Sequence, residues 1–251
     1  MKRTGTEVPP PSPELIRPPN EVLGESLELL NHLERSLEEK GDYRHLKRLV
    51  TDYRMFPPDD IEGIAAVVVL AQPALGSLAA QGELTRGTHV LLVKQQKGRW
   101  GGGTWAVPMG KIDPKRDSLD IPDESVSRDP PAAGVIKRAM LRELREEIRM
   151  TPAQAQLTIA GMFLDMKTEN VVHVGVENIV ATTHENTAPI VAELPDAREH
   201  SDIVWFPIEK IPEIENMSDG VRFVLLTAVR KIKADNIARQ ERRRQREQEK
   251  K

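Results

Sequence analysis

Apolar residues in the first quarter of the chain recur at the spacing of an amphipathic helix. Between Val22 and Leu37 they return every three or four residues, and Gly41 follows as a helix stop. The segment 42–55 repeats this spacing over a shorter stretch and predicts a second helix, which Pro57 and Pro58 end. Residues 1–20 are rich in proline and poor in apolar side chains, so they are predicted to form a disordered arm.

From residue 61 onward the pattern alternates between strands and helices, which predicts an α/β domain. Short apolar runs rich in β-branched residues predict strands at 64–70, 89–94, 157–165, 171–183 and 203–206, with a shorter strand at 105–108. Segment 132–150 carries the clearest helical stripe, and a last helix is expected to begin after Asn216 or Ser218. Loops are predicted at 73–88, 114–131 and 183–200, and the second is long enough to indicate a lid or an insertion.

Charge is unevenly distributed along the chain. The net charge is −3, but residues 230–251 hold ten basic and four acidic residues, which leaves +6 on this tail and −9 on the rest. Such a tail is either a solvated helix end or a contact for an acidic partner such as RNA. The chain has no cysteine, no run of 18 apolar residues and no secretory signal pattern, which favours a cytoplasmic protein with no membrane span.

The predicted helix 132–150 concentrates acidic side chains on one face. Glu146 and Glu147 follow Glu143 by three and four residues, so the three carboxylates lie close together and repel one another. Oxygen ligands of this kind suit a hard cation such as Mg²⁺, which serves hydrolysis at phosphorus. Taken alone, the six residues from Arg142 to Glu147 are more typical of a solvated charged face, because such faces are common.

The residues that surround this helix resemble the Nudix hydrolase family. The family motif is a glycine, five residues, a glutamate, seven residues and then Arg-Glu-apolar-x-Glu-Glu-x-Gly-apolar. Gly110 is similar to the first glycine, and the second half is matched by Arg142, Glu143, Leu144, Glu146, Glu147 and Met150. The flanking strands extend the resemblance over about residues 62–232. It implies an α/β/α sandwich with a mixed sheet, at 61–233, between a helical extension at 21–60 and a charged helical tail at 234–251.

Two positions depart from the family motif. The glutamate eight residues before the motif arginine is Gly134, and the late glycine is Arg149. The segment that follows Gly110 is also longer than five residues, so the insertion is expected to supply a substitute acid, with Glu124 and Asp129 as candidates. Neither departure removes an expected metal carboxylate, but both make a repurposed site more credible.

The resemblance implies roles for the site residues. Metal binding is expected of three carboxylates and one backbone carbonyl, which belong to Glu143, Glu146, Glu147 and Gly110. The metal is Mg²⁺, with Mn²⁺ as the alternative. Glu146 and Glu147 are also the catalytic carboxylates, and Arg142 orients the cluster through an ion pair. A further acid from an outside loop acts as base or ligand, and the candidate is Glu199, with Glu193 and Asp196 as alternatives.

Basic and aromatic side chains near the motif are candidates for substrate contact, namely Lys94, Arg99, Trp100 and Lys111. Lysines on loops are more often only solvated, so their assignment rests on their position near the acidic helix. Trp100 follows Arg99 and precedes three glycines, which leaves it free to stack on a base. Trp105 belongs to a predicted strand and is assigned to the core instead.

Three functions are compatible with these residues. Hydrolysis of a diphosphate bond in a nucleotide-type small molecule is favoured. An enzyme acting on the 5′ end of RNA is the alternative, because the turn at 108–113 is similar to that of mRNA-decapping Nudix proteins and the basic tail suits RNA. A nucleotide-binding module without catalysis is the third. The leucines of 21–56 need a surface to cover, either on this domain or on a second copy, so a homodimer is a further expectation.

Overall fold

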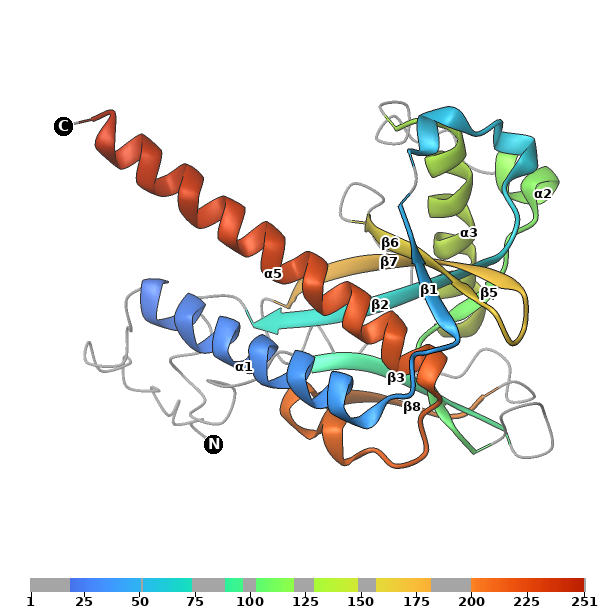
Figure 1. Cartoon of the computed structure of the whole chain (residues 1–251), viewed down its shortest axis with the longest axis horizontal. Coiled ribbons are helices and arrows are strands. Elements are labelled where there is room, and N and C mark those ends of the chain that lie inside the picture. The colour runs from blue at the N-terminus through green and yellow to red at the C-terminus, as the bar shows by residue number, and fades with distance from the viewer. Residues whose placement is uncertain are drawn as a thin grey trace, which may run out of the picture.

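The computed structural model describes residues 19–50, 52–73, 89–96, 103–119, 129–148, 157–181 and 200–250. Figure 1 shows a mixed sheet with helices on both faces. The strands are β1 (Leu46–Leu49), β2 (Ile64–Pro73), β3 (His89–Gln95), β4 (Trp105–Ala106), β5 (Met109–Lys111), β6 (Leu157–Asp165), β7 (Asn170–Ala181) and β8 (His200–Pro207). The α-helices are α1 (Pro19–Lys40), α2 (Pro114–Leu119), α3 (Pro131–Ile148) and α5 (Asp219–Gln248), and the 3-10 helices are η2 (Tyr53–Met55), η3 (Pro58–Asp60) and η9 (Ile208–Glu213).

The central strand β2 pairs with three other strands. It runs parallel to β7 along its whole length, antiparallel to β5 through its first residues and antiparallel to β3 through its last ones. The full order is β1-β6-β7-β2-β3-β4, with β5 beside β2 and β8 beside β3. Because β2 has strands on both sides and helices over both faces, its sequence is a continuous apolar run.

Alternate residues of β2 face different helices. Val68 and Leu70 line the core together with residues of α1, α5 and η9. The opposite face, which includes Val67 and its partner Gly175 on β7, packs against α3. The packing is close, because a Cβ on Gly175 would lie 2.4 Å from the sulfur of Met140. The acidic helix therefore covers one face of the sheet, and the two terminal helices cover the other (Figure 1).

The segment 42–55 does not form the predicted helix. Its centre is β1, which pairs antiparallel with β6 and so adds a strand at the edge of the sheet. Leu46 is buried there, while Lys47 and Arg48 are exposed. Short segments with an apolar residue every three positions fit helix and strand alike, and here pairing with β6 decides.

Helix α1 packs on its own domain. Its leucine stripe contacts α5 and η9, and Leu30, Leu33 and Leu37 are buried within the single chain. This surface was the reason to expect a homodimer, and the domain itself covers it. At the other end, Ser218 caps α5 by accepting a hydrogen bond from the Val221 amide at 3.3 Å. Among the described residues, no helix is both long and apolar enough to cross a membrane.

Candidate active site

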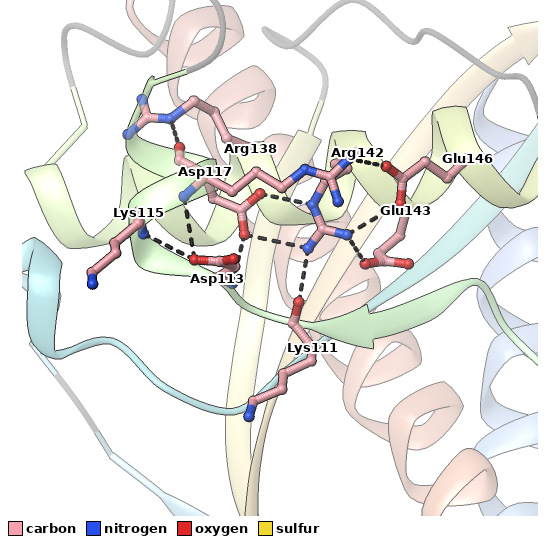
Figure 2. A network of polar contacts seen from close by, with 9 residues as sticks. Lys111, Asp113, Lys115, Asp117, Arg138, Arg142, Glu143 and Glu146 are labelled. Atoms are coloured by element: carbon pink, nitrogen blue, oxygen red, sulfur yellow. Dashed lines mark hydrogen bonds and ion pairs between the residues drawn. The ribbon is translucent and has the colours of Figure 1, made fainter.

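Arg142 is the centre of a polar network on the charged side of α3 (Figure 2). Its Nε donates to Asp117 Oδ1 at 2.8 Å, and its Nη2 donates to the carbonyl oxygen of Lys111 at 2.7 Å. Its Nη1 donates to Glu143 and, at 3.3 Å, to Glu146. One guanidinium thus joins β5, α2 and two carboxylates of its own helix. Burial alone would lower the pKa of Arg142, but Asp117 and the two glutamates raise it above its ordinary value.

Asp117 lies on α2, a helix that replaces the start of the predicted loop 114–131. Asp113 caps this helix by accepting from the amides of Lys115 and Arg116 at 3.1 and 3.2 Å, and Pro114 occupies the first helical position. In return, the Asp113 amide donates to Asp117 Oδ2 at 2.9 Å. These bonds fix the side chain of Asp117, which is only 2% exposed and faces Arg142.

Of the two acids that the sequence offered as a substitute for the motif glutamate, the described residues include one, and it does not pair with Arg142. Asp129 instead forms an ion pair with Lys137 at 2.6 Å near the start of α3, and Glu124 lies outside the described residues. Position 134 is itself inside α3, eight residues from Arg142, which corresponds to about 12 Å along a helix axis. The acid in contact with Arg142 is Asp117, which precedes the insertion.

Glu143 is buried against the backbone of Gly110. A Cβ on Gly110 would lie 2.2 Å from the Glu143 carboxyl carbon, so only glycine permits this approach. The side chain is 6% exposed, and burial raises the pKa of Glu143 to about 7, although the charge of Arg142 acts in the opposite direction. The structure thus brings together two of the predicted metal-binding residues from segments more than 30 residues apart in the sequence.

The two remaining carboxylates differ in environment. Glu146 is 43% exposed and contacts both Arg142 and Arg116. Glu147 is buried on the side of α3 that faces the start of β8, where the Nε2 of His200 lies 3.5 Å from its Oε2. The sequence did not single out His200. The one signal for it was its place directly after Glu199, the predicted loop acid.

The other predicted residues are placed as follows. Lys94 alternates with Val90 and Leu92 on β3, which puts it on the face opposite to α3, and its Nζ lies 5.3 Å from the ring centre of Trp105. The side chain of Lys111 is exposed, while its carbonyl contacts Arg142. The predicted residues outside the described part of the chain are Arg99, Trp100, Arg149, Met150, Glu193, Asp196 and Glu199.

A family model described as the NUDIX domain matches residues 77–225, which is more than half of the chain. The chain belongs to the NUDIX domain family. The match confirms the Nudix-type hydrolase predicted from the acidic helix, and together with the mixed sheet between helices it confirms the predicted fold class. No curated protein matches the chain.

Several solved structures are similar to this NUDIX protein at low sequence identity. The NUDIX domain of Shewanella oneidensis NrtR, complexed with ADP ribose, is 14% identical with a TM-score of 0.43, over 71% of this chain and 94% of that one. The Nudix hydrolase RenU from M. smegmatis is 17% identical with a TM-score of 0.39, over 69% and 86%. The C-terminal domain of mouse MUTYH, in complex with human PCNA, is 17% identical with a TM-score of 0.40, over 67% and 87%.

Proposed function

We propose that this NUDIX protein hydrolyses the diphosphate bond of a nucleoside diphosphate-linked small molecule with the help of Mg²⁺. The observation that carries the proposal is the set of three carboxylates on one turn of α3, two of which, Glu143 and Glu146, Arg142 ties to β5 and α2. Glu143 and Glu147 are buried, whereas the carboxylates of an ordinary charged helix face are solvated. Burying a carboxylate costs free energy, and such buried acids cluster at functional sites.

The chemistry of the described residues suits a hard divalent cation. Glu143 packs against the backbone of Gly110, so one proposed carboxylate ligand lies beside the residue whose carbonyl is proposed as a further oxygen ligand. The structure describes no three acidic or histidine side chains that converge on one point. Metal binding therefore requires Glu146 to turn away from Arg142 and Arg116, and its exposure leaves room for that change.

Each residue then has a distinct part in the proposed reaction. Glu143, Glu146, Glu147 and the carbonyl of Gly110 would hold Mg²⁺ or Mn²⁺. Bound there, the cation would neutralise charge on the diphosphate and lower the pKa of a water molecule. Arg142 keeps the carboxylates in place and does not touch the substrate. Glu146, the most exposed of the three, is the carboxylate best placed to meet solvent and accept a proton from water.

The test is product release with Mg²⁺ over nucleoside triphosphates, ADP-ribose, dinucleoside polyphosphates and NADH, with Glu146→Gln beside the wild type. We expect turnover of one class that requires the metal and falls at least about a hundredfold in the variant, which corresponds to roughly 3 kcal/mol of lost transition-state stabilisation. Absence of turnover by folded protein that still binds a nucleotide would favour the module without catalysis. The missing motif glutamate at Gly134 was one reason to consider a binding module without catalysis. It no longer is, because Asp117 supplies Arg142 with an acidic partner.

A second candidate, an enzyme acting on the 5′ end of RNA, is favoured by the end of α5. This helix continues beyond the sheet, as Figure 1 shows, and Arg242 and Arg246 lie four residues apart on one exposed face of it. Lys250, which is also exposed, follows just after the end of the helix. If this face holds RNA phosphates, binding of a 5′-triphosphate RNA weakens steeply with salt. The double variant Arg242→Gln with Arg246→Gln would then lose about two phosphate contacts. The slope of log affinity against log salt concentration would fall by about two. An unchanged dependence in the double variant would exclude this surface.

A further inference from the structure

We propose that His200 is a positioning residue for Glu147, a role that rests on the catalytic site proposed above. His200 is 6% exposed, and its Nε2 lies 3.5 Å from Glu147 Oε2. Among the described residues neither ring nitrogen has a hydrogen-bond partner at normal distance. An imidazole always carries at least one N–H, and a buried donor is costly when its bond is not made. A tautomer with the proton on Nε2 places that donor toward the carboxylate of Glu147.

An irregularity in the sheet brings His200 to this position. The β3–β8 ladder pairs Val93 with Ile203 and Lys94 with Asp202, and regular pairing would continue with Gln95 opposite Ser201. Instead Gln95 pairs with His200, so β8 contains one extra residue at this point, which is a β-bulge.

The bulge changes the face to which His200 belongs. Leu70 pairs with Val90 on the face covered by α1 and α5, so the alternate residues of β3, Leu91 and Val93, belong to the face of α3. Without the bulge, His200 would alternate with Asp202 and lie on the face away from α3. With the bulge, His200 lies opposite Gln95 on the face of α3, where Glu147 is. Bulges that redirect one side chain in this way are frequent beside active sites.

In the proposed arrangement, donors from two different elements face the carboxylates of α3. Arg142 contacts Glu143 and Glu146, while His200 approaches Glu147. A distance of 3.5 Å is longer than a made hydrogen bond, and such contacts often shorten only when the site fills. Residues that orient a metal-binding group in this way typically change metal affinity by roughly 10- to 100-fold.

The first measurement is the ¹⁵N spectrum of the imidazoles at fixed pH, which reports the tautomer without metal or substrate. We expect His200 to be protonated on Nε2, and we expect this signal to move in Glu147→Gln. A ring protonated on Nδ1 alone, or a signal that ignores the substitution at Glu147, would overturn the proposal. Because this measurement needs no turnover, failure of the proposed hydrolase and failure of this contact are distinguishable.

The second measurement compares two amides at position 200. In His200→Gln the amide nitrogen replaces Nε2, whereas in His200→Asn it replaces Nδ1. We expect His200→Gln to keep Mn²⁺ affinity, measured by electron paramagnetic resonance, within about threefold of wild type, and His200→Asn to lose roughly 10- to 100-fold, with kcat lowered and KM little changed. Equal behaviour of the two variants would contradict the role.

A second buried histidine supplies the matched control. His173 on β7 is 3% exposed, and its ring nitrogens contact Tyr53 and the carbonyl of Glu62. We expect His173→Asn to lower the unfolding midpoint without changing Mn²⁺ affinity. If His173→Asn weakened Mn²⁺ as much as His200→Asn, the effect would be one of general packing, and the proposal would be wrong.

Discussion

Two helices of this protein carry dense charge, and they use it in different ways. On α3, Arg142 binds the side chain of Asp117 and the carbonyl of Lys111, so its charge connects three elements of the fold. On the last turns of α5, Arg242 and Arg246 are exposed, and Figure 1 shows that this part of the helix extends away from the sheet. The sequences of both segments are rich in Arg and Glu, but within the part of the chain that the structure describes only the segment on α3 lies against other elements.

The difference shows what turns charged residues into a site. Charges on a solvated face are screened and contribute little to stability. A buried charge, by contrast, destabilises the fold strongly when one of its partners is removed. Helix α3 lies over a sheet and beside α2, which places its charges where their partners are fixed. Substitutions on α3 and its partners should therefore cost far more than equal substitutions on the end of α5, and the expected effects can be ordered from the largest to the smallest.

Asp117→Ala should have the largest effect on stability. The substitution leaves the guanidinium of Arg142 largely buried without the acid that accepts from its Nε. Removing one partner of a buried pair costs about 3–5 kcal/mol, which urea unfolding would measure. Arg142→Met in the same chain should recover only part of the loss, because it removes the unpaired guanidinium but also takes the cation away from the buried carboxylate of Glu143. A cost below about 1 kcal/mol, as for an exposed pair, would contradict the role of Asp117 as the anchor.

The position of this anchor also shows what the sequence could and could not predict. Strong periodic signals predict α3 and most of the strands, and of the two cap residues offered for α5, Asn216 and Ser218, the structure uses Ser218. The three carboxylates of the proposed site come from the family motif. The motif spacing pointed to Gly134 for the acid, because a count along the chain cannot tell that an insertion follows Asp117. The capping signal Asp113-Pro114 was present, and it would have predicted α2.

Other features depend on pairing between distant segments, which a single sequence does not specify. Strand β1 is decided by β6, about 115 residues later in the chain. The bulge that turns His200 toward Glu147 is a property of the β3–β8 register. Neither is encoded in local periodicity, so both were missed. The acidic face of α3 is a similar case. Its partners belong to α2 and β5, so the sequence of the helix alone does not distinguish a site from a solvated charged face.

Glu177→Gln should change stability in a pH-dependent way. Glu177 on β7 is fully buried, and burial raises its pKa to about 7. A raised pKa favours the protonated, folded form below pH 4.5, and this contribution is lost as pH rises toward 7. The loss is about 3 kcal/mol for a shift from 4.5 to about 7, at 1.36 kcal/mol per unit. The variant, which cannot ionise, should exceed wild type at about pH 8 by that amount and match it near pH 4.

Urea unfolding at the two pH values checks this expectation, with Glu209→Gln as the control. Glu209 is exposed on η9, so its removal should leave the pH dependence of unfolding unchanged. Equal pH profiles for wild type and Glu177→Gln would contradict the prediction. They would mean that ionisation of the Glu177 carboxyl does not lower the free energy of unfolding.

Gly110→Ala should cost less stability but disturb the site directly. The new Cβ would lie 2.2 Å from the carboxyl carbon of Glu143, so that side chain has to move. Overpacking of this kind costs about 1–3 kcal/mol, and Mn²⁺ affinity should fall as well. Gly220→Ala is the matched control, because its Cβ would come no closer than 3.9 Å to a neighbour and it lies in the first turn of α5. Equal effects of the two alanines would refute the close approach of Glu143 and Gly110.

Substitution of the exposed basic residues of α5 should have the smallest effect. Arg242→Gln with Arg246→Gln removes two charges that extend into solvent, and surface changes of this kind stay within about 0.5 kcal/mol. Arg230, nearer the start of the same helix, is the internal contrast, because its Nε donates to Glu34 of α1 at 3.0 Å. Arg230→Gln should cost about 1 kcal/mol, as a partly exposed ion pair does. A double variant less stable than Arg230→Gln would mean that the end of α5 packs against something, and the contrast between α3 and α5 would no longer hold.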